Sequence, residues 1–543
     1  MGTENVAQHD VDLAVVGTGI GGLTAAIVAA DHGLRVLLIE RSDRLGGVGA
    51  VSGGAAWLPL TRFGAEGNAG DSYEQVMDYL NFLSAGHGTT AHRERFAASV
   101  ADATHYLADQ AGVQWSLVKG CVDNYAPWAP GVVPNCRMLE VEPIDGTELA
   151  EWQELTRRSP FFPPGLKFSE MRDPGSLSES LGALIAQRRD TDARAAGEGL
   201  LAYLVKAALV DRGIPVLLNT RADSLITADG RVSGLRCDDG TEIRAARGVV
   251  LATGGYDWNT ANQIETSPGF SSSAPAVVTG DHLVMAGEIG AAITVLPTVG
   301  MHTQLGYSLP TEEYEGKPLW RWALYEAAAR HSIIVNDQGE RFCDETWFFQ
   351  QQDQLRDFDS VNRRYRNVPA YLIIDQNHRD QTRFGPYAAG RPLPEPFVTS
   401  DSLEGLAEQL GLPADRLLET VHRFNGFCQN GKDEDFGRGD KALIDFLYPS
   451  SDGSSTVLGP IERGPFYAIE LTLGGLGSNN AGLQTDPDTV VQHVRGRSID
   501  GLYAVGNAAA HLDFGPVYVS GGIIARCIVG GYLAGLHAAG VTA

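Results

Sequence analysis

The chain of 543 residues is long enough to form two or more domains, each with its own buried core. Hydrophobic residues make up 43% of it and charged residues 20%, a composition typical of a globular enzyme and unlike that of a disordered chain. The formal net charge of -25 argues against binding to nucleic acid, whose phosphates require a surface of Lys and Arg, and against binding to an anionic membrane.

Targeting, membrane and metal signals are missing. Residues 1–12 carry no basic segment followed by an apolar run, and no stretch reaches the roughly 18 uninterrupted apolar residues that span a bilayer. The 6 cysteines lack the CxxC spacing of a zinc site or a redox dithiol, which fits a reducing compartment. We therefore expect a cytoplasmic protein with no integral membrane segment and no metal. The sequence does not indicate its oligomeric state.

The first recognisable unit is a strand, a helix and a second strand. An apolar run at 11–16 leaves no room for a helix before the glycines that follow, and this predicts a buried parallel strand. Residues 22–32 predict a helix that Gly33 ends, and residues 34–39 predict the next strand. This order is the setting in which a glycine-rich turn binds a dinucleotide.

The turn at 17–22 reads Gly-Thr-Gly-Ile-Gly-Gly. Gly17 allows the tight turn, Gly19 lets the backbone approach a pyrophosphate, and Gly22 lets the helix pack on the strand. The phosphates then meet the free N–H groups at the positive end of the helix. Glu40, at the end of the second strand, is placed to accept hydrogen bonds from the ribose hydroxyls of the adenosine.

FAD is the expected dinucleotide. A pyridine-nucleotide-dependent disulfide reductase has a second GxGxxG motif and a redox cysteine pair, and this chain has neither. Glycine-rich turns at 253–255 and 506–507 lie far along the chain and fit an FAD stretched across the domain. No histidine occurs from Gly33 to Gly86, so we expect the FAD to be bound non-covalently.

The rest of the chain predicts an interrupted first domain. The glycines at 46–54 are too dense for regular structure, and 151–199 predicts a long surface excursion, either a solvated insertion or part of the substrate entrance. Glycine-rich turns return after residue 470, so the segment before it is an insertion. Predicted elements of the first domain are a helix at 200–211, strands at 215–219, 223–228, 232–237, 248–252 and 501–505, and a last helix at 523–538. The predicted domains are 1–285 and 470–543 for FAD binding, and 286–469 for the catalytic domain.

Several segments together resemble one known family. They are 40–41, 45–47, 52–59, 123–127, 252–256, 279–281, 334–342, 420–425 and 501–507. The chain resembles the flavoprotein family of 3-ketosteroid dehydrogenases and fumarate reductase flavoproteins, and most closely its delta-1 and delta-4 ketosteroid dehydrogenase branch. The resemblance implies an α/β fold in which a Rossmann-like FAD-binding domain is split in sequence by an inserted α+β catalytic domain.

The resemblance also implies the reaction and the FAD contacts. Two vicinal hydrogens are removed next to a ketone: a base takes the alpha proton, and flavin N5 takes a hydride from the beta carbon. The alpha proton is acidic enough only where hydrogen-bond donors stabilise the developing enolate oxygen. The expected FAD contacts are Gly17, Gly19, Gly22, Glu40, Arg41, Gly46, Gly47, Ser52, Gly53, Gly54, Ala222, Thr253, Gly254, Asp281, Gly506, Asn507, Gly522 and Ile523.

The segment 518–522 is the best candidate for the catalytic machinery. It precedes the last helix, whose N-terminal N–H groups can face an enolate or the negative charge of a reduced flavin. Tyr518 and Gly522 resemble the carbonyl-holding pair of the delta-1 enzymes. Tyr518 and Ser520 also resemble the delta-4 (5-alpha) enzymes, in which tyrosine and serine both act. Both assignments stay open, beside the alternative that Tyr518 only packs against the flavin.

Two further residues are site candidates. Tyr125 resembles the tyrosine of the family's active-site stretch and is expected to act as base or as relay to the base; the alternative is a loop aromatic that closes the pocket. His511 lies in the glycine-rich turn near the end of the chain, where a structural role is weighed against contact with substrate.

Two departures from the family pattern bear on the substrate. Delta-1 enzymes carry a tyrosine shortly after the acidic pair that here is Asp344-Glu345, and this chain has Trp347, Phe348 and Phe349 instead. A phenyl ring cannot take a proton, so the base must be Tyr125, Tyr518 or a residue that the sequence does not place. The three aromatic rings are suited to line an apolar pocket. No arginine occurs between 506 and 525 to clamp a dicarboxylate.

The sequence therefore predicts an FAD-dependent dehydrogenase that desaturates an apolar cyclic ketone, 3-ketosteroid-like, and passes electrons to an external acceptor. An enone reductase running the reverse reaction is one alternative. A flavin-binding protein that has lost catalysis is the other, because the expected tyrosine is missing.

Overall fold

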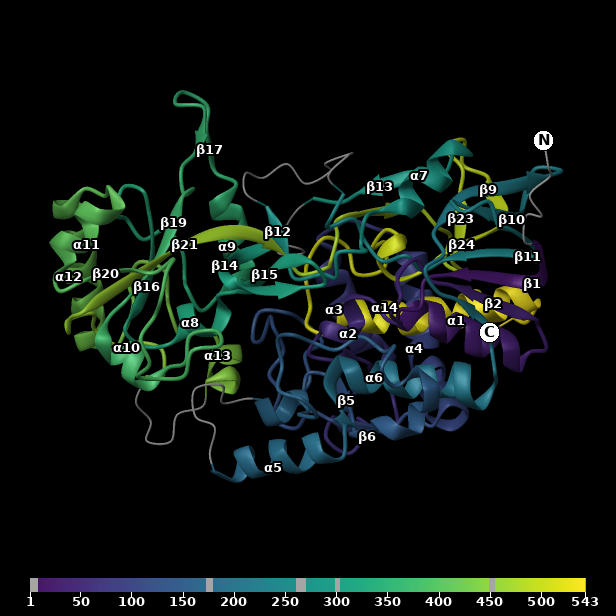
Figure 1. Cartoon of the computed structure of the whole chain (residues 1–543), viewed down its shortest axis with the longest axis horizontal. Coiled ribbons are helices and arrows are strands. Elements are labelled where there is room, and N and C mark those ends of the chain that lie inside the picture. Colours follow the sequence, from purple (N-terminus) through teal and green to yellow (C-terminus); the bar gives the residue numbers. More distant parts are fainter. Residues whose placement is uncertain (1–7, 172–178, 260–269, 298–302, 449–454, 543) are drawn as a thin grey trace.

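The computed structural model describes residues 8–171, 179–259, 270–297, 303–448 and 455–542. The chain forms an elongated body with two main β-sheets, one in each half (Figure 1). The half drawn in purple, teal and yellow holds β1 (Gln8–Val16) and β24 (Ser498–Ala504), and the half drawn in green holds the second sheet.

The helices and strands of the described residues are numbered in chain order. The helices are α1 (Ile20–Asp31), α2 (Val48–Val51), α3 (Tyr73–Ser84), α4 (Thr90–Ala111), α5 (Glu179–Asp190), α6 (Ala196–Val205), α7 (Asp281–Glu288), α8 (Leu324–Ala328), α9 (Phe348–Leu355), α10 (Gln376–Gln381), α11 (Leu403–Leu410), α12 (Ala414–Asn430), α13 (Ala442–Leu447) and α14 (Gly522–Ala539), with short helical segments η1 (Gly146–Trp152), η2 (Phe168–Met171), η3 (Lys206–Asp211) and η4 (Gly506–Ala508). The strands besides β1 and β24 are β2 (Val36–Ile39), β3 (Ala56–Trp57), β4 (Trp115–Leu117), β5 (Met138–Val141), β6 (Ile144–Asp145), β7 (Ala193–Arg194), β8 (Val216–Leu217), β9 (Ala222–Ala228), β10 (Arg231–Cys237), β11 (Glu242–Leu251), β12 (Ser271–Ser272), β13 (Ile293–Val295), β14 (Thr303–Tyr314), β15 (Lys317–Trp322), β16 (Ser332–Asn336), β17 (Phe358–Asp359), β18 (Arg364–Tyr365), β19 (Ala370–Ile374), β20 (Val398–Ser400), β21 (Phe466–Gly475), β22 (Ala481–Leu483) and β23 (Val490–Gln492).

The first sheet has the order β23-β24-β11-β1-β2-β8, and β9 and β10 extend it. Its central strands β1, β2, β11 and β24 run parallel. A parallel strand is buried on both faces and needs apolar side chains throughout. In β1, Leu13 and Val15 pack into the core on one side of the sheet, and Ala14 and Val16 into the core on the other. Because β24 pairs with β11, the chain after residue 470 completes the first sheet, as the sequence predicts.

Helix α14 packs along α1 beneath this sheet (Figure 1). Glycines permit the close approach, because a Cβ at Gly535 would lie 2.7 Å from the Cβ of Val28. Among the described helices, α14 alone has the length and apolar composition to cross a bilayer, but 67% of that stretch is buried inside the protein. Packing against α1 accounts for its composition.

The strand–helix–strand unit of β1, α1 and β2 confirms the prediction for residues 11–39, whereas the prediction of no regular structure at 46–54 is wrong, because that stretch contains α2. Most described residues of 151–199 are half-buried or exposed, as predicted, and the stretch becomes continuously buried only near its end, where α6 begins. Phe161, Phe162 and Phe168 line the cavity described below, which favours the substrate-entrance alternative for this stretch. A Cβ at Gly197 would overlap the carbonyl oxygen of Gly49, so α2 and α6 touch through their backbones, a long-range contact with no local signal.

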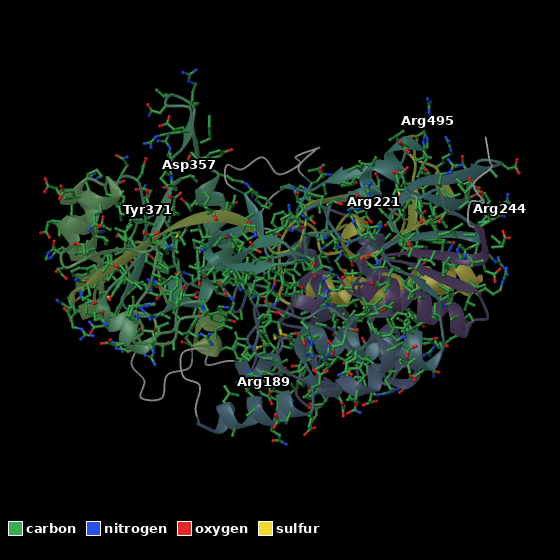
Figure 2. The ribbon with its side chains drawn as sticks, viewed as in Figure 1. Arg189, Arg221, Arg244, Asp357, Tyr371 and Arg495 are labelled. Carbon is green, nitrogen blue, oxygen red and sulfur yellow. The ribbon has the colours of Figure 1, made fainter. Side chains whose placement is uncertain are left out.

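The second sheet has the order β15-β14-β21-β19-β16, with β12 and β20 also paired to β21. Helices α11 and α12 cover one face, against the side chains of Ile333, Val335 and Ile373. A hairpin of β17 and β18 projects from this half of the molecule (Figure 1), and Asp357 lies at its base (Figure 2).

Strand pairs cross the predicted domain boundary at residue 285 in both directions. β12 lies before that residue and pairs with β21 of the second sheet, whereas β13 lies after it and pairs with β22 near the first sheet. The described strands of the second sheet otherwise run from Thr303 to Gly475. The division of the chain at 285 and 470 stays a prediction.

Candidate active site

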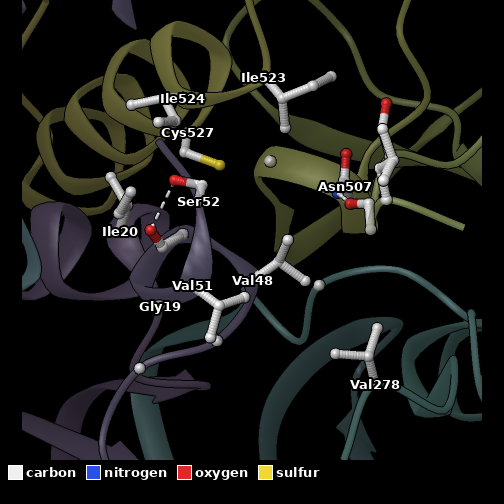
Figure 3. Close-up of a pocket in the computed structure, with 18 of the residues that line it drawn as sticks. Gly19, Ile20, Val48, Val51, Ser52, Val278, Asn507, Ile523, Ile524 and Cys527 are labelled. Atoms are coloured by element: carbon white, nitrogen blue, oxygen red, sulfur yellow. Dashed lines mark hydrogen bonds between the residues drawn. The ribbon is translucent and has the colours of Figure 1, made fainter. Parts of the chain in front are cut away.

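A cavity of about 310 Å³ opens where β1, β2 and β11 end and continues to side chains of the second half. Gly19, Ser52 and Ile523 are far apart in the chain and approach the same space (Figure 3). Most residues that the sequence assigns to the site line this cavity. They are Gly17, Gly19, Glu40, Arg41, Gly46, Gly47, Ser52, Gly53, Gly54, Ala222, Thr253, Gly254, Asp281, Gly506, Asn507, Tyr518, Ser520 and Ile523.

Three predicted site residues do not line the cavity. Gly22 has the packing role expected of it, because a Cβ there would overlap the carbonyl oxygen of Gly17. The N–H of Gly522 donates to the carbonyl oxygen of Val519 at 3.0 Å, and Gly521 takes its place on the wall. Tyr125 does not line the cavity but contacts the backbone of Tyr518, which does.

The first end of the cavity fits a pyrophosphate. Gly17 has φ 105°, and a Cβ there would overlap the carbonyl oxygen of Ala252, so only glycine fits. At Gly19 a Cβ would meet no protein atom within 4 Å, although the residue lines the cavity. No side chain caps the N-terminus of α1 at Gly19. The N–H groups of this helix end are therefore open to an anion.

Charged side chains gather next to the phosphate site. The buried Glu40 carboxylate accepts hydrogen bonds from the Thr18 hydroxyl at 2.7 Å and the Ser42 hydroxyl at 3.0 Å, which fix its orientation. Asp281 pairs with Arg41 and with Arg221, each at 3.0 Å. Burial alone would raise the pKa of Asp281, but the two arginines outweigh it and the pKa lies below its ordinary value. This polar end suits the ribose and adenine of a dinucleotide.

The opposite end of the cavity is apolar and uncharged. Among the described residues, the charged side chains of the whole wall are Glu40, Arg41, Arg221 and Asp281, all at the polar end. The apolar end belongs to one cluster of packed side chains. Its lining residues are Cys121, Val122, Met138, Phe168, Trp322, Leu324, Tyr325, Phe348, Leu443, Phe446, Leu447 and Tyr518.

A polar loop holds the segment of Tyr518 from behind. The side chain of Asn124 binds Ser520 twice: its amide donates to the Ser520 hydroxyl at 3.2 Å, and its oxygen accepts from the Ser520 N–H at 2.8 Å. The Tyr125 hydroxyl donates to the Tyr518 carbonyl oxygen at 2.6 Å. The geometry therefore gives Tyr125 a part in positioning Tyr518, and it does not place the Tyr125 hydroxyl at the cavity wall.

The three aromatic residues after Glu345 support Tyr518. Phe348 lines the cavity, and its ring centre lies 6.2 Å from that of Tyr518. Phe349 packs between Tyr518, at 5.5 Å, and Tyr125, at 5.8 Å, while Trp347 packs on Phe349 at 4.8 Å. Phe348 therefore forms part of the cavity wall, whereas Trp347 and Phe349 pack behind it.

Sequence reasoning missed Tyr325 at the apolar end, and it left the role of His511 open. Tyr325, in α8, lines the cavity, and nothing in its local sequence distinguishes it from a packing tyrosine. His511 is buried and makes a hydrogen bond with the Asn507 side chain at 3.1 Å, so it has the structural role. The neighbouring Arg526 bonds to Asp513 at 2.6 Å and does not line the cavity, which leaves no dicarboxylate clamp on the described wall.

The comparisons with known proteins agree with this geometry. Residues 12–524 match the FAD binding domain family. The chain is 31% identical to the 4-oxocyclohexanecarboxylate 2-dehydrogenase of Sinomonas cyclohexanicum, over 98% of this chain and 93% of that protein. It is 30% identical to the 3-oxosteroid 1-dehydrogenase of Mycolicibacterium smegmatis, over 98% of both.

A solved structure gives the same result for the fold. The 3-ketosteroid delta1-dehydrogenase from Sterolibacterium denitrificans, in complex with 1,4-androstadiene-3,17-dione, superposes with a TM-score of 0.88 at 27% identity, covering 98% of this chain and 100% of that one. The family, the α/β fold and the FAD expected from the sequence are confirmed. The chain belongs to this FAD-binding family, and it is an FAD-dependent oxidoreductase that acts on CH–CH groups.

Proposed function

We propose that this enzyme desaturates an apolar, 3-ketosteroid-like cyclic ketone. The observation that carries the proposal is the uncharged aromatic wall around Tyr518. Of the two relatives described above, one is named for a ketone that bears a carboxylate and the other for a steroid. An unpaired carboxylate buried against such a wall loses its hydration without compensation, so the wall favours the steroid-like substrate.

FAD, when bound, supplies the acceptor for the hydride that leaves the beta carbon. The chain supplies the base, which we assign to Tyr518. Burial raises the pKa of Tyr518, but its hydrogen bond with Ser520 counteracts part of that rise. Helix α14 begins at Gly522, four residues after Tyr518, and the positive end of this helix favours a phenolate nearby. Ser520, held by Asn124, is then a relay for the proton.

The carbonyl side of the reaction needs hydrogen-bond donors. Gly521 and Ile523 line the cavity at the start of α14. N–H groups at a helix end stabilise an enolate oxygen as it forms. The segment 518–523 thus carries both functions that the removal of an alpha proton requires.

The substrate proposal is tested by anaerobic mixing. We expect 4-androstene-3,17-dione or its ring-saturated analogues to bleach the flavin absorbance near ~450 nm. The matched compound is 4-oxocyclohexanecarboxylate, which should bleach the flavin at least about tenfold more slowly, because no described residue at the apolar end carries a positive charge to pair with its carboxylate. Faster reduction by the carboxylate, or no bleaching by any of these ketones, contradicts the proposal.

The direction of the reaction is tested with the same protein. If an enone reoxidises dithionite-reduced enzyme while no saturated ketone bleaches the oxidised form, the enzyme is a reductase. If neither reaction occurs, the chain binds flavin without catalysis. The external electron acceptor, the cytoplasmic location and the non-covalent attachment of FAD stay predictions.

Gly19→Val tests the phosphate cradle. Gly19 has φ -72° and ψ 178°, which valine adopts, and its Cβ would meet no protein atom, so we expect the variant to fold. Its side chain fills the space left for phosphate, and FAD affinity should fall at least about tenfold. Flavin content per folded protein, with circular dichroism as the check of folding, measures the effect. Gly287→Ala, in α7 and away from the cavity, is the control that keeps its flavin.

A further inference from the structure

The apolar end of the cavity contains a second phenol besides Tyr518. Tyr325 lies in α8, in the half of the molecule that holds the second sheet, and lines the cavity together with Trp322 and Leu324. It keeps part of its surface accessible although it lies deep in the protein, and the cavity provides that access. Its hydroxyl is thus placed to meet a bound molecule.

This hydroxyl has no hydrogen-bond partner in the part of the chain that the structure describes, neither a side chain nor a backbone group. Burial, and after it the charge of Glu326, raise the pKa of Tyr325 to about 12, so the group is a neutral phenol at physiological pH. A hydroxyl in apolar surroundings without a partner costs free energy, and an acceptor on the substrate removes that cost.

Tyr325 and Tyr518 stand at different places on the wall. Tyr325 packs against Trp322 and Tyr448, with ring centres 6.4 Å away in each case. Tyr518 packs against Phe348 and Phe349 instead. The pKa of each phenol also responds to its own surroundings, Glu326 for Tyr325 and Ser520 for Tyr518. The uncharged end of the cavity therefore has two phenols with separate surroundings.

We propose that Tyr325 donates a hydrogen bond to a second oxygen of the substrate, at the end remote from the ketone that reacts beside Tyr518. The proposal rests on the proposed function and narrows it: the substrate is a rigid apolar polycycle with an oxygen at each end. Tyr325 is then a specificity-determining residue. It takes no part in the chemical step, because the reacting ketone lies beside Tyr518.

Tyr325→Phe with two substrates tests this assignment. One substrate is 4-androstene-3,17-dione, and the other is the same steroid without the 17-oxygen. We expect the variant to raise KM for the dione about tenfold, the factor that one net hydrogen bond supplies, and to leave KM for the mono-ketone unchanged. The kcat values should stay within about twofold of wild type, because the reacting ketone is held elsewhere.

A binding measurement and a control variant separate substrate binding from turnover and from packing. Dissociation constants from the change in flavin absorbance on ligand binding should show the same tenfold effect without turnover. The control is Tyr448→Phe, the neighbouring phenol whose hydroxyl donates to the Leu324 carbonyl oxygen at 3.4 Å and which does not line the cavity. It should affect both steroids equally.

Specific outcomes overturn the assignment. Equal changes in KM for the two steroids would show that Tyr325 only packs. A fall of kcat by more than about 100-fold with both would place it at the reacting ketone or make it the base. If wild type neither binds nor oxidises either steroid, the proposed function fails, and this proposal fails with it. If wild type oxidises both steroids with equal KM, the proposed function stands, and only the hydrogen bond to a second substrate oxygen is contradicted.

Discussion

Tyr518→Phe is expected to lower kcat by about 10²- to 10⁴-fold, the usual contribution of a positioned acid–base group. The ring of Tyr518 keeps its contacts with Phe348 and Phe349, so the variant should fold and bind FAD as wild type does. Only the phenol oxygen, which we propose takes the proton, is lost. Stopped-flow measurement of flavin reduction by the steroid gives the rate of the chemical step.

The pH dependence adds a second readout for Tyr518. The pKa of this buried phenol lies above the ordinary value of 10.0. A base must be deprotonated, so kcat of wild type should rise about tenfold per pH unit between pH 7 and 9. Ser520→Ala removes the hydrogen bond that lowers this pKa and should reduce kcat less than Tyr518→Phe does. Unchanged turnover in Tyr518→Phe would show that Tyr518 is not the base.

Glu345→Gln is expected to lower the free energy of unfolding by about 3–5 kcal/mol. The Glu345 carboxylate is fully buried, 2.8 Å from the Arg341 guanidinium and 3.2 Å from that of Arg438, and it also accepts from the Ile334 N–H at 3.2 Å. The variant leaves buried arginines without their full counter-charge. Urea titration monitored by circular dichroism measures the loss.

The same carboxylate predicts sensitivity to acid. Burial alone would raise the pKa of Glu345, but Arg341 and Arg438 outweigh it, and the folded-state pKa is lower than the ordinary value. A lowered pKa adds stability at pH values above the unfolded pKa of about 4.3, and that stability is lost as the pH falls through the folded-state value. Glu419→Gln, in an exposed pair with Arg416, is the control that leaves stability unchanged. An equal effect of the two variants contradicts the assignment.

Local sequence signals predicted the cofactor end of the site. The turn at 17–22, the carboxylate Glu40 and the last helix each depend on residues close together in the chain, and the structure brings all three to one cavity. Glycine-rich turns are visible without knowledge of the fold because the backbone itself approaches the ligand there.

The substrate end could not be predicted in the same way. Tyr325 lines the cavity because the fold packs α8 and α13 against the same apolar cluster, and no local pattern encodes that contact. Tyr125 was recognised as a site residue, but the sequence does not indicate that its hydroxyl points to the Tyr518 carbonyl oxygen. Side-chain direction in a loop depends on partners that lie hundreds of residues away, here 393.

Among the described residues, those of 286–469 that line the cavity all lie at its apolar end. The groups suited to the dinucleotide come from the first sheet and its helices, whereas Trp322, Leu324, Phe446 and Leu447 come from the half that holds the second sheet. Changes in α8 and α13 can therefore alter which ketone binds while the charged residues of the dinucleotide end stay the same. Diversification within such a scaffold needs few substitutions, none of them in the phosphate-binding turn.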